Sequence, residues 1–135
     1  MKKLLVLIAS LSLTACAGMM SGSTVNLSLG GSQEVPSLSV PGSGSGSFTI
    51  GEDGAVTGSV TTTGVAGTMA HIHMAARGAN GPVIVPLTKN GNTYSAPAGA
   101  KFNNAQMQAF KAGNLYVNVH TDRNKGGEVR AQLQP

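Results

Sequence analysis

Short segments in which apolar and polar residues alternate dominate the chain after its first 24 residues. Val25, Leu27 and Leu29 alternate with Asn26 and Ser28, which is the two-residue period of a strand with one buried face. Similar segments recur along the chain, at residues 47–50, 55–62, 69–74, 83–87, 92–95, 115–120 and 128–133. Many short strands of this kind predict a β-sandwich or barrel.

Turn signals separate several of these segments. Gly51-Glu52-Asp53-Gly54 follows the segment 47–50 and precedes the segment 55–62, so it predicts a hairpin. Asn90-Gly91 predicts a second tight turn. Further segments are bounded by prolines that mark edges or loops: Pro36, Pro41, Pro82, Pro86 and Pro97. We therefore expect an all-β fold, an antiparallel Greek-key sandwich or barrel.

One segment departs from the strand pattern and predicts a short helix over residues 104–111. Asn103 can cap its first turn, and Gly113 can take the left-handed conformation that ends a helix. Met107 and Phe110 would pack this helix across the sheet. We expect it to be a packing element without chemistry of its own.

The N-terminus carries a predicted sorting signal. Lys2 and Lys3 precede an apolar run, Leu4 to Leu13, that is too short to cross a bilayer as a helix. The tetrapeptide Leu13-Thr14-Ala15-Cys16 resembles a bacterial lipobox, whose cysteine is lipidated and becomes the first mature residue. Cys16 is the only cysteine in the chain, so it has no disulfide partner.

These features divide the chain into a signal peptide over residues 1–15, a lipidated cysteine with a flexible tether over 16–24, and one domain over 25–135. Ala17 follows the cysteine where an inner-membrane retention signal favours Asp. The resemblance thus implies an outer-membrane lipoprotein, anchored by acyl chains and facing the periplasm or the cell surface. An ordinary secretory signal with an unmodified cysteine is the alternative.

Composition excludes several function classes. The formal net charge is +4, but two lysines belong to the signal peptide, the other basic residues are scattered and there is no Trp, so nucleic-acid binding has little support. Serines are plentiful, yet none lies in a nucleophile elbow. The few carboxylates are scattered, which argues against glycosidase chemistry and against a calcium loop.

All three histidines of the chain lie in two predicted strands. Because side chains alternate between the faces of a strand, His71 and His73 point away from Ile72, and His120 points away from Val119. If the apolar residues face the core, the three imidazoles lie on an outer face. Neighbouring imidazoles there would form a metal site that suits copper or zinc. A structural hydrogen-bonding role for the histidines is the alternative.

The last two strands are expected to form a hairpin. The expected register places His120 opposite Glu128, Asn118 opposite Arg130 and Tyr116 opposite Gln132, all on the outer face. Arg130 would then lie one cross-strand diagonal from His120, where a guanidinium would attract anions to the imidazoles. Asn118 and Arg130 could equally be a structural cross-strand pair.

Three further features bear on the site. Glu34 could accept a hydrogen bond from the second nitrogen of a ligand histidine, or it could hold a loop to a strand. Met74 offers a soft sulfur ligand, but its parity with Ile72 favours core packing. Residues 78–82 carry turn chemistry and are assigned no direct role in the site.

Four segments of the chain resemble the CHRD domain. They are Gln33-Glu34-Val35-Pro36, His71-Ile72-His73 followed by residues 78–83, residues 113–121, and Gly126-Gly127-Glu128-Val129-Arg130. The resemblance covers roughly residues 25–133. It implies an extracytoplasmic β-sandwich and gives little on molecular function.

A weaker similarity is to the copper–zinc superoxide dismutases. Those enzymes carry two copper ligands as His-x-His, a later ligand before a polar loop, and a late arginine that guides superoxide. The corresponding residues here are His71, His73, His120 and Arg130. The similarity implies a dismutase-like fold and copper ahead of zinc. The chain lacks a fourth histidine to bridge the two metals, an evident zinc loop and a disulfide.

Three functions follow as hypotheses. The first is an envelope lipoprotein that binds copper through His71, His73 and His120 and buffers or delivers it. The second is a dismutase-like copper enzyme in which Arg130 steers the anion. The third is a metal-free interaction module for a protein partner that the sequence does not identify.

Overall fold

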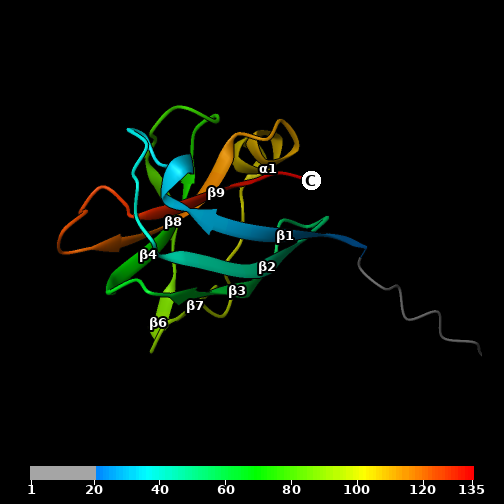
Figure 1. Ribbon diagram of the computed structural model, residues 1–135. Coiled ribbons are helices and arrows are strands. Elements are labelled where there is room, and N and C mark those ends of the chain that lie inside the picture. Colours follow the sequence, from blue (N-terminus) through cyan, green and yellow to red (C-terminus); the bar gives the residue numbers. More distant parts are fainter. Residues whose placement is uncertain (1–20) are drawn as a thin grey trace, which may run out of the picture.

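The computed structural model describes residues 21–135 (Figure 1). Its elements are β1 (Gly22–Gly30), the 3₁₀ helix η1 (Gly31–Gln33), β2 (Ser43–Gly51), β3 (Val56–Thr63), β4 (Gly67–Met74), β5 (Val83–Pro86), β6 (Thr88–Asn90), β7 (Thr93–Ser95), α1 (Asn104–Lys111), β8 (Leu115–Thr121) and β9 (Val129–Leu133). The paired strands are all antiparallel. The predicted all-β fold with one short α-helix is confirmed.

The sheet curls round until its two edges nearly meet. Its nine strands follow the order β5-β4-β8-β9-β1-β2-β3-β7-β6. The edge strands β5 and β6 are separated in the chain by Leu87 alone. The amide of Leu87 donates to the carbonyl of Ala70 in β4 at 3.0 Å, which ties this junction to the neighbouring strand. The result is a nearly closed barrel or sandwich with one interior.

The alternating apolar side chains fill this interior. Val25, Leu27 and Leu29 of β1 are buried, as the pattern predicts. The other strands and the helix add further buried apolar residues, among them Phe48, Ile50, Val56, Val60, Ile72, Phe110, Leu115, Val117, Val119, Val129 and Leu133. Removing these side chains from water is the main favourable contribution to folding.

Both predicted hairpin turns are present, and three strand segments were missed or misplaced. The turn after β2 lies at residues 51–54, and Gly91 adopts a left-handed φ of 60° between β6 and β7. Strand β2 begins at Ser43, four residues before the predicted segment, and β6 was not predicted. Strand β1 begins at Gly22, so residues 22–24 belong to the sheet and not to the expected tether. These segments contain no apolar residue, so alternation gave no signal there.

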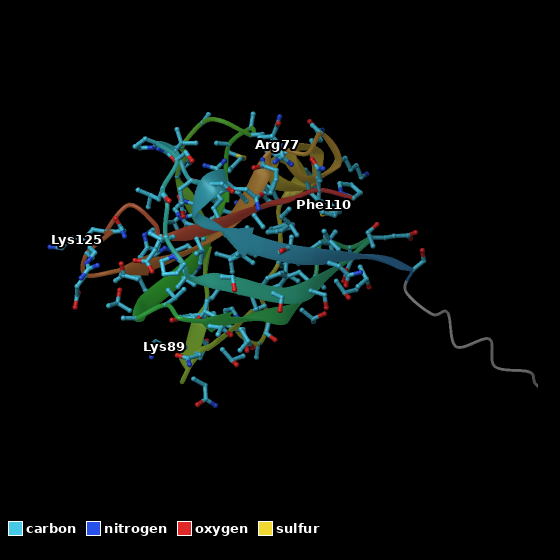
Figure 2. The ribbon with its side chains drawn as sticks, in the orientation of Figure 1. Arg77, Lys89, Phe110 and Lys125 are labelled. Atoms are coloured by element: carbon cyan, nitrogen blue, oxygen red, sulfur yellow. The ribbon has the colours of Figure 1, made fainter. Side chains whose placement is uncertain are left out.

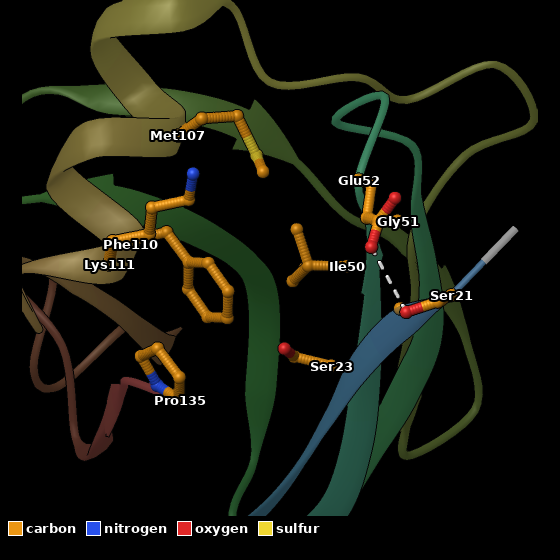
Figure 3. Close-up of a pocket in the computed structure, with 10 residues that line it drawn as sticks. Ser21, Ser23, Ile50, Gly51, Glu52, Met107, Phe110, Lys111 and Pro135 are labelled. Carbon is orange, nitrogen blue, oxygen red and sulfur yellow. Dashed lines mark hydrogen bonds between the residues drawn. The ribbon is translucent and has the colours of Figure 1, made fainter.

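Helix α1 covers one end of the sheet. The side chain of Asn103 accepts from the amide of Gln106 at 2.8 Å, and the Gln106 side chain accepts from the amide of Asn103 at 2.9 Å. This reciprocal cap fixes the start of the helix. Phe110 and Met107 point from the helix toward Ile50 across a pocket of about 480 Å³ (Figure 3). No histidine lines this pocket, so it is separate from the candidate site.

The predictions for the N-terminal signal and for lipidation of Cys16 concern positions outside the described residues 21–135. Over that described range, no helix combines the length and the apolar character needed to cross a membrane.

Candidate metal site

Strands β4 and β8 bring the three histidines together. The antiparallel register pairs His71 with Asn118 and His73 with Tyr116. His120 follows two residues after Asn118, so all these side chains share the face opposite to the core. The predicted parity is therefore correct. This face is not open to water, however, because His73 is 7% exposed and His120 is 8% exposed.

The ring nitrogens of the three histidines converge. Nδ1 of His71 lies 2.9 Å from Nε2 of His120. One nitrogen from each of His71, His73 and His120 can be chosen so that all three lie within 4.8 Å of one another. The ring centroid of His73 lies 5.5 Å from that of His71 and 5.8 Å from that of His120. Three ring nitrogens therefore lie close enough together for a metal ion to be considered between them.

Backbone carbonyls orient two of the rings. Nδ1 of His73 lies 2.9 Å from the carbonyl oxygen of Gly81, and Nδ1 of His120 lies 2.8 Å from that of Lys125. A carbonyl only accepts, so each Nδ1 carries the proton and each Nε2 keeps its lone pair. Histidines that bind metals are held in this way by a hydrogen bond to their second nitrogen. Both rings thus present an unprotonated nitrogen to the cluster.

The surroundings keep the imidazoles of His71 and His73 neutral. Burial, followed by the charges of His120 and His73, lowers the pKa of His71 to about 4. Burial also lowers the pKa of His73, although its hydrogen bond to Gly81 opposes this effect. At pH 7 these two rings are therefore uncharged, which is the form that binds a metal ion.

Arg130 lies where the hairpin register predicts, and its guanidinium is enclosed by a loop. Asn118 pairs with Arg130, as expected. The guanidinium carbon of Arg130 lies 3.5 Å from the centroid of the Tyr116 ring. Its two terminal nitrogens donate to the carbonyls of Ala79 at 2.9 Å and Ala76 at 3.3 Å. The side chain is 1% exposed, so it holds the loop between β4 and β5 over the sheet.

At the loop end of this hairpin, the pairing differs from the one expected, which placed His120 opposite Glu128. Ladder pairing ends at Val119 and Val129, and the carboxylate of Glu128 turns toward the β8–β9 loop. Its Oε1 accepts from Oγ1 of Thr121 at 3.1 Å and from Nδ2 of Asn124 at 2.8 Å. Glu128 therefore shapes the loop whose Lys125 carbonyl orients His120.

Glu34 and Asn118 lie beside the cluster. Burial raises the pKa of Glu34 to about 7, opposed by the Asn118 amide and by the charge of Arg130. The Asn118 side chain donates to the carbonyl of Gly126 at 3.1 Å. Within residues 21–135, no hydrogen bond joins Glu34 directly to a histidine. Among the described residues, Glu34 therefore lies beside the cluster without a hydrogen bond to its rings.

Three buried polar atoms at this place have no hydrogen-bond partner within the described part of the chain. They are Oε1 of Glu34, Nε2 of His73 and Oδ1 of Asn118. A buried polar atom without a partner costs roughly 1–3 kcal/mol. The Nε2 of His73 belongs to the converging histidines, so a metal ion would supply the interaction that this atom lacks.

Sequence reasoning missed that two loops covering the site, β4–β5 and β8–β9, orient the histidine rings. Residues 78–82 were expected to have no direct role, yet the Gly81 carbonyl orients His73. Asn80 also donates to the carbonyl of Val35 at 2.7 Å, joining this loop to the segment that carries Glu34. Figure 2 shows the two covering loops, with Arg77 in one and Lys125 in the other. Backbone carbonyls have no residue signature, so residue types could not reveal them.

Met74 is partly buried and packs against the core, as its parity predicted.

Comparison with protein families finds the CHRD domain over residues 25–133, which is most of the chain. No curated protein matches the sequence, and no solved structure matches the fold. The similarity to the copper–zinc superoxide dismutases therefore has no counterpart in these comparisons.

Proposed function

This chain belongs to the CHRD domain family, and we propose that its domain binds one copper ion through His71, His73 and His120. The observation that carries this proposal is the convergence of three imidazole nitrogens, one of them buried without a hydrogen-bond partner among the described residues. The ligating atoms are Nε2 of His73 and His120, and Nδ1 of His71 once the proton that it donates to His120 has moved to its own Nε2.

The spacing of the nitrogens supports a metal ion. Two nitrogens bound at about 2.05 Å in a tetrahedral site lie roughly 3.3 Å apart. Nδ1 of His71 and Nε2 of His120 are separated by 2.9 Å, so the pair needs to open by only a few tenths of an ångström. The nitrogens of the cluster lie within 4.8 Å of one another, so His73 must approach the other two by up to about 1.5 Å to share an ion. Its hydrogen bond to Gly81, like that of His120 to Lys125, leaves Nε2 unprotonated for this step.

The donor set favours copper. No carboxylate belongs to the cluster, which argues against magnesium and calcium, because these ions take oxygen ligands. Imidazole nitrogen binds copper more tightly than the other divalent metals of the first transition row, zinc included. Three protein ligands leave one position open, which allows a bound ion to be passed on. Copper buffering or delivery is the activity that this arrangement supports best.

The place of action follows from the N-terminal sequence. Acylation of Cys16 would hold the domain at the outer membrane, facing the periplasm or the surface. In that compartment the domain would meet copper before the cytoplasm does. The protein partner that gives or takes the ion is not defined by the sequence.

A dismutase-like enzyme receives less support than a binding protein. The guanidinium that would steer superoxide is 1% exposed and donates to the loop carbonyls of Ala76 and Ala79. We therefore expect a copper-loaded protein without superoxide turnover.

Copper affinity measured by competition with a chelator tests the proposal. The intact chain is compared with His71→Ala, His73→Ala and His120→Ala, each first shown to be folded by circular dichroism. Loss of one ligand should weaken binding at least as much as the 10- to 100-fold that follows loss of an outer-shell partner. Lys125→Ala is the control, because it keeps the backbone carbonyl that orients His120.

The outcomes separate the three hypotheses. Tight binding that each histidine variant loses, without superoxide turnover, supports the proposed function. Turnover by the loaded protein would favour the redox enzyme. If the intact chain binds no copper, the histidines are structural and the interaction module is the better account.

A further inference from the structure

Met69 is an exposed apolar residue beside the histidine cluster. It is 50% exposed, although large apolar side chains of the described residues are mostly buried. From Met69 onward its strand alternates, and the next residues on the opposite face, Ala70 and Ile72, are buried in the core. Met69 therefore lies on the same face of β4 as His71 and His73.

The sheet register places Met69 directly opposite a ligand histidine. In the antiparallel pairing of β4 with β8, Met69 is the cross-strand partner of His120. Such partners have Cβ atoms about 5 Å apart, on one face of the sheet. His120 in turn contacts His71 through the 2.9 Å nitrogen pair. Met69 thus adjoins two of the three nitrogen ligands.

The thioether of Met69 has the freedom to reach the cluster. Methionine is unbranched and has three rotatable bonds, and half of this side chain is unpacked. The cluster is also most open on this side, since His71 is only partly buried whereas His73 and His120 are buried. The fourth, open coordination position therefore has a soft sulfur atom within reach at its exposed edge.

We infer that Met69 is a fourth ligand that makes the site selective for Cu(I). Soft thioether sulfur favours Cu(I), whereas imidazole nitrogen alone also suits Cu(II) and zinc. Three nitrogens and one sulfur complete a four-coordinate site, and the sulfur is the ligand nearest to solvent. Cu(I) enters and leaves by this exposed edge. The inference rests on the proposed copper site and adds which oxidation state it takes.

The test compares Cu(I) and Cu(II) affinities of the intact chain with those of Met69→Leu, using anaerobic competition with a Cu(I) chelator. Met69→Leu should lower the Cu(I) affinity by about tenfold or more and leave the Cu(II) affinity within about twofold. Met74→Leu is the matched control, because Met74 lies on the same strand but faces the core. Met74→Leu should change neither affinity.

A second measurement reads the sulfur directly. In the intact chain with ¹³C-labelled methionine methyl groups, one equivalent of Cu(I) should shift the Met69 resonance and leave the Met74 resonance in place. If both resonances stay unchanged, or if Met69→Leu binds Cu(I) as the intact chain does, Met69 is not a ligand. The copper site itself survives that result as long as the histidine variants lose both ions. If the intact chain binds neither ion, both proposals fail.

Discussion

Glu34 is a carboxyl group in surroundings that disfavour its charge. Its side chain is 5% exposed, and burial raises its pKa to about 7 from the ordinary 4.5. The unfolded chain therefore ionises first as the pH rises from 4.5 to 7. Over that range the folded state loses stability relative to the unfolded state, and above pH 7 the penalty is constant.

Glu34→Gln removes this penalty. The variant should stabilise the metal-free protein more at pH 8 than at pH 5, with a difference of at most about 3 kcal/mol. The free energy of unfolding from urea titrations at the two pH values, with a metal chelator present, is the measurement. Glu52→Gln, at an exposed carboxylate, controls for the loss of one negative charge. An equal gain at both pH values would contradict the assignment of the raised pKa to Glu34.

At the residue scale, the sequence predicted which face of a strand a side chain occupies better than which groups that side chain contacts. Parity correctly grouped His71, His73 and His120, because a strand has only two faces. It did not predict that this face is buried or that Arg130 bonds to Ala79. Those contacts depend on where two loops fold, which a two-residue period does not describe. The sequence pattern gives no signal for Met69 as part of the site, because an apolar side chain in a strand normally indicates packing.

The loop between β8 and β9 is the element that fixes His120. The backbone carbonyl of Lys125 in this loop orients the ring. Gly127 lies near the end of the loop with a φ of 126°, a backbone conformation that residues with a side chain rarely adopt. A Cβ at Gly127 would also collide with the Asn118 amide and the Glu34 carboxylate. Gly126 lies next to it, and a Cβ there would meet open space.

Gly127→Ala should therefore lower the free energy of unfolding by roughly 1–3 kcal/mol. Gly126→Ala should change it by no more than about 0.5 kcal/mol. Chemical denaturation of both variants and the parent chain checks the difference. Equal effects of the two substitutions would show that the packing of Glu34 and Asn118 against this loop does not matter for stability.

The predicted elements succeeded where the signals are local. Helix α1 spans Asn104–Lys111 as predicted, because its cap residue Asn103 and its terminator Gly113 lie beside it in the sequence. The β8–β9 register also agreed at Asn118 and Arg130, because one face of each strand is apolar. Strand β6 (Thr88–Asn90) has only exposed polar residues and forms through pairing with β7. Such a strand depends on its neighbour and leaves no pattern of its own.

At the scale of the whole molecule, the sheet starts close to the predicted anchor. Strand β1 begins at Gly22, so residues 17–21 alone separate it from Cys16. Five residues span at most roughly 18 Å when fully extended. If Cys16 is acylated, the domain is therefore held close to the bilayer. Closure of the sheet at Leu87 could not be predicted from the sequence, because β5 and β6 are adjacent in the chain yet lie at opposite ends of the strand order.

Cys16→Ser should release the protein from the membrane fraction, because the thiol that would carry the acyl chain is lost. Fractionation of cells followed by immunoblotting measures the distribution. Ala17→Ser is the control, because it alters the neighbouring residue and keeps the cysteine. If Cys16→Ser stays in the membrane fraction at the parent level, the protein is not a lipoprotein anchored at this residue.

The most direct test of the copper site is a crystal structure of the copper-loaded protein with anomalous data collected at the copper edge. We expect one anomalous peak, which marks a copper ion about 2.0–2.1 Å from each of three nitrogens. They are Nδ1 of His71 and Nε2 of His73 and His120. The hydrogen bonds of His73 to Gly81 and of His120 to Lys125 should persist. A peak located elsewhere would contradict the account. So would crystals grown with excess copper that show no peak and keep the His71–His120 contact intact.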